Sequence, residues 1–168
     1  MNYGKAIVDY LQRHFRPQMQ DEKLATVHQI DNFRFSLELA DFDKFSFVLY
    51  SMTISQADDK KLDIPTLRKR AQLLREKITY LSEQLEIGEI DNKNCKLQLR
   101  SALPKEKAMP FKYFEITLTG TPSIAVDRFL YESKGTARMK TSYHLTEHIL
   151  KKLINDFVAV LAKPRNGS

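Results

Sequence analysis

The 168-residue chain contains one cysteine and no tryptophan. A lone cysteine cannot form a disulfide within the chain, which excludes the disulfide-rich scaffolds of small secreted proteins. Cys95 lies in Asn94-Cys95-Lys96-Leu97, which matches no signature of a catalytic thiol. We therefore interpret Cys95 as a packing residue.

A long hydrophobic run is also lacking. The longest stretch without a charged residue is 45–57, which is too short for a membrane helix and contains Ser and Thr throughout. Lys5 and Asp9 interrupt any apolar region near the N-terminus, so no signal peptide is expected. The sequence therefore predicts a cytoplasmic protein without a membrane partner.

Hydrophobic residues make up 42% of the chain and charged residues 29%, as in ordinary globular proteins. A chain of this length suits one domain, which buries roughly 70% of its unfolded surface on folding. We expect a single domain over residues 1–168, with residues 163–168 as a frayed tail.

Three segments show the spacing of apolar residues that is typical of helices. The first ends before Pro17, because proline cannot continue the helical hydrogen bonds. The second has Asp63 as its N-cap, Pro65 in its first turn and Gly88 just beyond its end. These features predict helices over residues 1–15, 64–85 and 146–162.

Other segments alternate apolar and polar residues, which indicates strands with one wet face. Turn-forming clusters at 41–44, 91–94 and 120–123 separate them, so neighbouring strands are expected to be antiparallel. The expected strands are residues 24–30, 33–39, 45–54, 97–99, 113–119 and 124–131. The fold class is therefore α+β, with an N-terminal, a long central and a C-terminal helix packed on one side of antiparallel sheet.

The central segment carries apolar residues at alternating steps of three and four from Ile64 to Leu85. This seam resembles three heptads, which pack either on the chain's own sheet or on a partner helix. Leu73 and Tyr80 lie off the seam, so the helix is apolar on more than one side. We therefore predict a homodimer whose partner surface contains Leu67, Leu74, Ile78 and Leu81.

Charge is unevenly distributed. Residues 1–63 hold 8 Lys+Arg and 10 Asp+Glu, whereas residues 64–168 hold 19 and 11. The basic part indicates an acidic protein partner or, alternatively, nucleic acid, although the aromatic residues fall at strand positions that look buried. The candidate anion-binding residues are Arg68, Lys69, Arg70, Lys134, Arg138 and Lys140.

His144-Leu145-Thr146-Glu147-His148 forms the H-x-x-E-H string of one class of zinc hydrolases. On one helix the two imidazoles would share a face and a zinc ion. Thr146, however, looks like a helix N-cap, which would leave His144 outside the helix, and no third ligand outside that helix follows. We keep a zinc hydrolase as a distant alternative and expect no catalytic residue, cofactor or metal.

The order of elements resembles that of the small chaperones of type III secretion systems. The segments that carry the resemblance are Tyr3–Phe15, Leu24–Ile54, Ile64–Leu85, Cys95–Tyr131 and Thr146–Ala162, without a shared motif. The resemblance implies a dimer that binds an unfolded protein segment, although such chaperones tend to be acidic. The leading hypothesis is a non-catalytic, chaperone-like protein-interaction module.

Overall fold

The computed structural model describes residues 1–15, 23–58, 60–101, 110–132 and 137–164. Its elements are α1 (Tyr3–His14), β1 (Leu24–Ile30), β2 (Phe33–Phe42), β3 (Ser46–Gln56), α2 (Ile64–Lys77), β4 (Leu85–Asp91), β5 (Lys96–Ser101), β6 (Phe111–Thr119), β7 (Ser123–Tyr131), β8 (Met139–Thr141), β9 (Tyr143–Thr146) and α3 (Glu147–Leu161). This composition confirms the α+β class and its three helices.

All nine described strands belong to one antiparallel sheet with the order β1-β2-β3-β7-β6-β5-β4. The short strands β8 and β9 pair with β7 and β3 respectively. Two meanders, β1–β3 and β4–β7, are joined where β3 pairs with β7 through Met52–Val126 and Ile54–Ile124. The sheet therefore unites residues from both halves of the chain.

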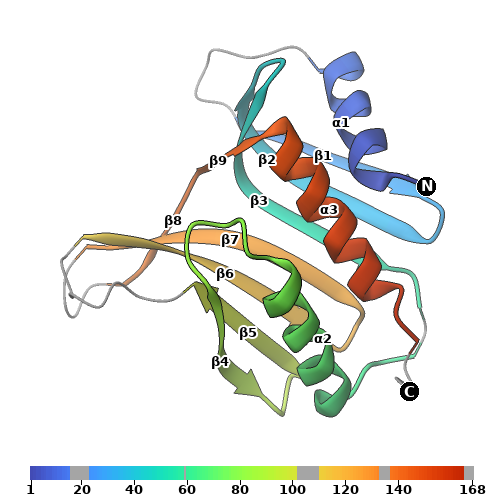
Figure 1. Cartoon of the computed structure of the whole chain (residues 1–168), viewed down its shortest axis with the longest axis vertical. Helices are drawn as coiled ribbons and strands as arrows, with labels where there is room; N and C mark the ends of the chain where they lie inside the picture. The colour runs from blue at the N-terminus through green and yellow to red at the C-terminus, as the bar shows by residue number, and fades with distance from the viewer. Residues whose placement is uncertain (16–22, 59, 102–109, 133–136, 165–168) are drawn as a thin grey trace.

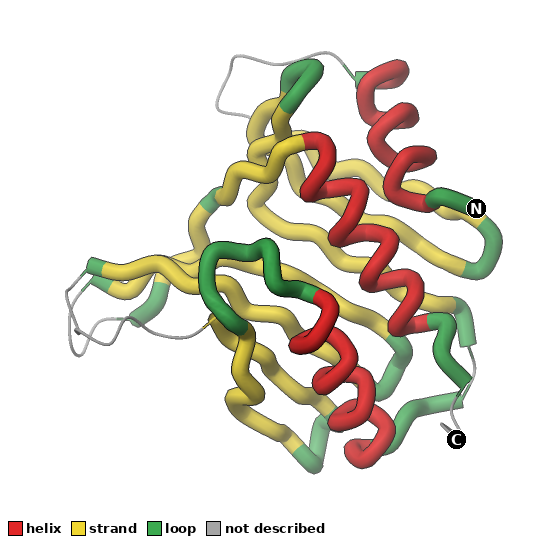
Figure 2. Tube along the Cα trace, viewed as in Figure 1, coloured by secondary structure: helices red, strands yellow, loops and turns green. Residues whose placement is uncertain are grey.

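The three helices lie on one face of the sheet, as Figure 1 shows. In the tube view of Figure 2 the opposite face carries no helix. We call this opposite side the helix-free face. The core fills the space between the helices and the sheet, and its largest fully buried side chains include Phe35, Phe47 and Phe157. An antiparallel sheet tolerates this asymmetry because its strands alternate apolar and polar residues.

Local capping chemistry sets the helix starts where the sequence predicts them. Asp63 accepts a hydrogen bond from the backbone N–H of Thr66 at 2.9 Å. Thr146 likewise accepts one from the N–H of Ile149 at 3.2 Å. At α1, Asn2 caps the helix by accepting from Lys5. Each cap satisfies a donor that the first turn would otherwise leave unpaired.

The prediction of one continuous helix over residues 64–85 is wrong. α2 ends at Lys77, and Leu85 is the first residue of strand β4. Ile78 and Leu81 still enter the core, but from an irregular connection in which Ser82 has φ 30°. The β-branched residues Ile78 and Thr79 have a lower helix propensity than the residues before them. The apolar side chains of this segment are buried although their backbone is not helical.

The remaining strands differ from the prediction mainly in number. Six strands follow α2, whereas the alternation predicts strands only at residues 97–99, 113–119 and 124–131. β4 begins at the last residue of the expected helix, and β8 and β9 form between residues 131 and 146, where no strand was expected. The sequence predicts that the frayed tail starts at residue 163. The carbonyl of Lys163, however, accepts a 3.0 Å hydrogen bond from Arg70, so this residue is attached to the rest of the fold. Residues 165–168 lie outside the described part of the chain.

Candidate functional site

Strand β6 is covered on both faces, although helices pack on only one of them. Phe114, Ile116 and Leu118 belong to the main core. Because side chains alternate along a strand, Tyr113 and Glu115 lie on the helix-free face. Both are nevertheless buried, at 6% and 4% exposure. Side chains from neighbouring strands therefore cover them there.

Four aromatic rings, one of them that of Tyr113, form a group at one end of β6 and β7. The antiparallel register of β6 and β7 places Tyr113 opposite Phe129, and Phe111 opposite Tyr131. The ring centroids lie 5.8 Å apart in the first pair and 5.4 Å in the second. These distances are typical of favourable aromatic pairs. Figure 1 shows this end of β6 and β7 extending beyond the helical layer.

Two arginines converge on the carboxylate of Glu115. Arg100 on β5 donates from Nε to Oε2 at 3.2 Å, since the register places Arg100 opposite Glu115. Arg138, which precedes β8, pairs with the same oxygen and also donates to the Tyr113 hydroxyl at 3.2 Å. The hydrogen bond with Glu115 raises the pKa of Arg138 above its ordinary value.

The guanidinium groups also lie against the aromatic rings. Arg138 stands 4.0 Å from the centroid of Phe129, and Arg100 stands 5.8 Å from that of Tyr113. Such cation–π contacts fix the orientation of a guanidinium while leaving one of its faces open. The rings, the arginines and the buried acid thus form one preorganised assembly.

A second ion pair borders this assembly. Lys140 Nζ lies 3.0 Å from Asp127 Oδ1, and Lys140 is opposite Phe129 in the β7–β8 register. The nine residues form what we call the outer cluster: Arg100, Phe111, Tyr113, Glu115, Asp127, Phe129, Tyr131, Arg138 and Lys140.

The outer cluster presents its positive charges to solvent and covers its negative ones. The side chains of Arg100, Arg138 and Lys140 are 37, 36 and 46% exposed. Those of Glu115 and Asp127 are only 5 and 20% exposed. A molecule approaching this face therefore meets guanidinium and ammonium groups beside aromatic surface.

The six candidate anion-binding residues do not form one site. Arg138 and Lys140 belong to the outer cluster, whereas Arg68 and Lys69 are exposed on α2. Arg70, the next residue, is buried at 4% exposure. Arg68, Lys69 and Arg70 therefore do not form one exposed basic surface. Lys134 lies outside the described residues.

The predicted partner surface is also corrected. Leu67, Leu74, Ile78 and Leu81 are only 1, 0, 1 and 3% exposed. They pack into the chain's own core, so they offer no surface to a second molecule. The apolar seam is explained by packing on the sheet, which was the other interpretation of its spacing.

The H-x-x-E-H string does not lie on one helix. His144 belongs to strand β9, while Glu147 and His148 begin α3 after the cap at Thr146. The shared helical face that a zinc ion would need is therefore not formed. Glu147 is paired with Lys151, one turn along the helix. Across the described ranges, no group of three or more metal-ligating side chains comes together.

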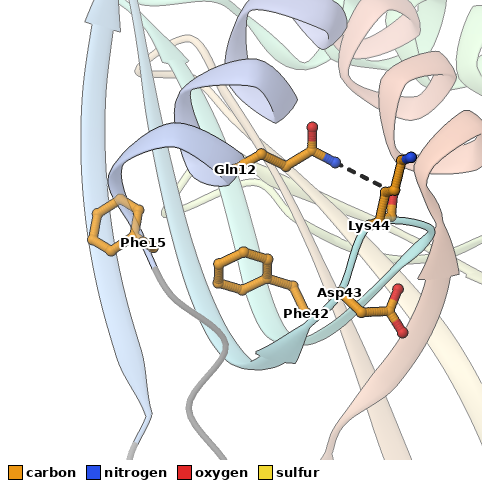
Figure 3. A pocket seen from close by; sticks show the side chains of 5 residues that line it. All are labelled: Gln12, Phe15, Phe42, Asp43 and Lys44. Carbon is orange, nitrogen blue, oxygen red and sulfur yellow. Dashed lines mark hydrogen bonds between the residues drawn. The ribbon is translucent and has the colours of Figure 1, made fainter.

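A pocket of about 280 Å³ lies between the end of α1 and the β2–β3 turn. Figure 3 shows Phe15 and Phe42 on its sides, with the Gln12 amide donating to the Lys44 carbonyl at 3.3 Å. The Asp43 carboxylate accepts from the backbone N–H groups of the turn, which lowers its pKa. The polar groups of this pocket thus stabilise the β2–β3 turn, and we do not assign a ligand to the pocket.

Sequence reasoning missed four central residues of the outer cluster: Arg100, Tyr113, Glu115 and Phe129. The signal was the segment 111–114, Phe-Lys-Tyr-Phe, which places aromatic side chains on both faces of one strand. The expectation that the aromatic residues are buried holds for Tyr113, whereas Phe111, Phe129 and Tyr131 are only partly buried.

Comparison of the chain with protein-family models, curated proteins and solved structures finds no significant match in any of the three. Among the described helices, none is long and apolar enough to span a membrane. The fold and the outer cluster define the class: an α+β protein with one antiparallel sheet, helices on one face, and an arginine–aromatic assembly on the other.

Proposed function

We propose that the chain is a non-catalytic protein-binding module that holds an acidic protein segment on its helix-free face, at the outer cluster. The observation that carries the proposal is the exposure of Arg100, Arg138 and Lys140 above nearly covered acids. Arginine and aromatic residues are also the types most enriched at the energetic centres of protein interfaces.

Glu115 supports the proposal by fixing the two guanidinium groups. A guanidinium carries five N–H donors, and a carboxylate can accept two of them side by side. Glu115 takes only part of this capacity from Arg100 and Arg138. Because both arginines are already ordered, they lose less side-chain entropy when an incoming carboxylate binds.

The geometry favours a protein partner over single-stranded nucleic acid. Nucleic-acid binding by stacking needs ring faces that are free to accept bases. Here Phe129 is covered by Arg138, and Phe111 is stacked on Tyr131. Tyr113 is only 6% exposed. The resemblance in element order to type III secretion chaperones points the same way, because those proteins bind unfolded protein segments.

The test is fluorescence anisotropy with labelled peptides rich in Asp and aromatic residues. Matched peptides with Asn in place of Asp, and a single-stranded DNA oligonucleotide, serve as competing ligands. We expect the acidic peptide to bind most tightly. Arg138→Gln should weaken the binding of this peptide about tenfold or more, because a charge-assisted hydrogen bond to the peptide is lost. Lys69→Gln removes an exposed charge from the helical side and should leave affinity unchanged.

Equal binding of the acidic and amide peptides, or tighter binding of DNA, would overturn the proposal. Circular dichroism of Arg138→Gln must show a folded protein. Because Arg138 also stabilises Glu115, Arg138→Lys provides a second measurement. It keeps the charge but not the planar fork, and should give an intermediate affinity.

A further inference from the structure

The two edges of the sheet differ in how they are protected. Exposed edge strands usually carry charges, bulges or proline, which discourage pairing with another strand. β4 has a register irregularity between Ile87 and Ile90, and it contains Glu86, Glu89 and Asp91. β1 pairs in one continuous register with β2 and contains no Lys, Arg, Asp or Glu. Of these two edge strands, as the described residues form them, β1 is the one that lacks such protection.

The backbone groups on the open side of β1 can be identified from the turn. Ile30 and Phe33 flank the two-residue turn Asp31-Asn32, where the tight-turn hydrogen bond makes them a bonded pair. Bonded and non-bonded pairs alternate along an antiparallel ladder. The N–H and C=O groups of Ala25, Val27 and Gln29 therefore point away from β2, toward the edge.

No described element covers this edge. α1 lies over the inner face of β1, where Tyr10 stacks on His28 with ring centroids 4.1 Å apart. Thr26 faces the same way and is 7% exposed. Val27 lies on the helix-free face and is 52% exposed, an apolar side chain in the middle of the strand.

We propose that β1 pairs antiparallel with β1 of a second copy of this chain, which joins two sheets into one. Val27 is the middle residue of β1, so a twofold axis there overlaps the strands fully. Val27 then faces the partner's Val27, and Ala25 faces the partner's Gln29. These are the residues whose backbone groups point outward, so every pair can exchange hydrogen bonds.

The charges at the two ends of β1 favour the same register. Lys23 immediately precedes β1, and Asp31 immediately follows it; both are exposed. Within the chain, Lys23 Nζ lies 4.4 Å from the centroid of the Tyr50 ring, and Asp31 accepts a 2.7 Å hydrogen bond from the Tyr3 hydroxyl, so both charges stay close to the ends of the strand. The pairing centred on Val27 places Lys23 opposite the partner's Asp31, and the symmetry repeats this contact at the other end. Opposite charges at facing positions stabilise paired strands. This inference does not depend on the outer cluster, which lies beyond β3 in the sheet.

The test is the mass of the whole chain in solution, by light scattering and sedimentation over a range of concentrations. We expect a dimer for the natural sequence. Val27→Lys places like charges at the axis and should raise the dissociation constant about tenfold or more. Val27→Pro removes an outward N–H and should also weaken the dimer. The variant is expected to fold, because edge strands tolerate proline. Ile87→Lys, the same type of change at the β4 edge, should leave the dimer intact.

A charge exchange tests the register directly. Lys23→Glu alone and Asp31→Lys alone should each weaken the dimer, and the double variant should restore it. A chain that stays monomeric at hundreds of micromolar would overturn the proposal. So would a dimer that survives both Val27 variants while they stay folded, or one that Ile87→Lys dissociates. Failure of the double variant to restore the dimer would refute the Val27-centred pairing.

Discussion

Replacing Glu115 by glutamine tests the assembly on which the proposed binding site depends. Glutamine keeps the shape of the side chain but removes its charge and replaces one acceptor oxygen with an N–H donor group. Arg100 and Arg138 both pair with this carboxylate, which is 5% exposed. In the variant, two guanidinium groups converge on a neutral amide, with no anion between them.

The expected loss of stability follows from the burial of the three groups. Removing one partner of a fully buried ion pair costs roughly 3–5 kcal/mol. The arginines, however, keep 37 and 36% of their side-chain surface in water, which screens the uncompensated charge. We therefore expect a loss of about 2 kcal/mol in the free energy of unfolding. For a protein of this size, the melting temperature falls by roughly 4–8 °C.

The measurement is urea unfolding followed by circular dichroism. The control is Glu147→Gln, which breaks the surface pair with Lys151 within one helix. Pairs of that kind contribute roughly 0.3–0.5 kcal/mol, and the helix dipole adds a similar amount. A Glu115→Gln loss no larger than that of the control, at an unchanged denaturant slope, would refute the idea that Glu115 organises the two arginines.

Two further predictions concern the rest of the fold. Gly4→Ala should lower the free energy of unfolding by at least about 1 kcal/mol, because an added Cβ would lie 2.2 Å from the backbone oxygen of Lys151. Gly88→Ala, whose Cβ would have no neighbour closer than 3.5 Å, is the matched control in the same urea assay. Burial raises the pKa of Tyr143 above its ordinary value of 10.0. The contribution of the neutral side chain to the free energy of unfolding is therefore fully present below pH 10.0 and is lost as the pH rises toward the raised pKa. Thermal melts should therefore show stability falling above about pH 10, and a smaller fall in Tyr143→Phe.

Features that depend on neighbours in the sequence could be predicted. The caps at Asp63 and Thr146 are where expected because capping uses a side chain and an N–H group three residues on. The paired runs of β1, β2 and β3 were visible as alternation between turn residues. The α+β class follows from the number and order of these local elements.

Features that depend on the register between distant strands could not be predicted. Glu115 meets Arg100 and Arg138 because β6 pairs with β5 on one side and with β7 on the other, and β7 in turn pairs with β8. No local pattern states which strands become neighbours. The helix predicted from the apolar seam ends too late for a related reason. Ile78 and Leu81 can be buried in the core by helical or irregular backbone alike, so their spacing does not establish a helix.

The position of the two proposed surfaces has a consequence for how the molecule would act. β1 is one edge of the sheet, whereas the outer cluster is built on β5 to β8, on the far side of β3. Pairing through β1 would therefore leave both outer clusters uncovered, on the same continuous helix-free face. A partner with two acidic segments could contact both, and linked binding of this kind exceeds the affinity of either site alone. Variants at Val27 would then weaken binding of a two-segment partner without changing the affinity for a single peptide.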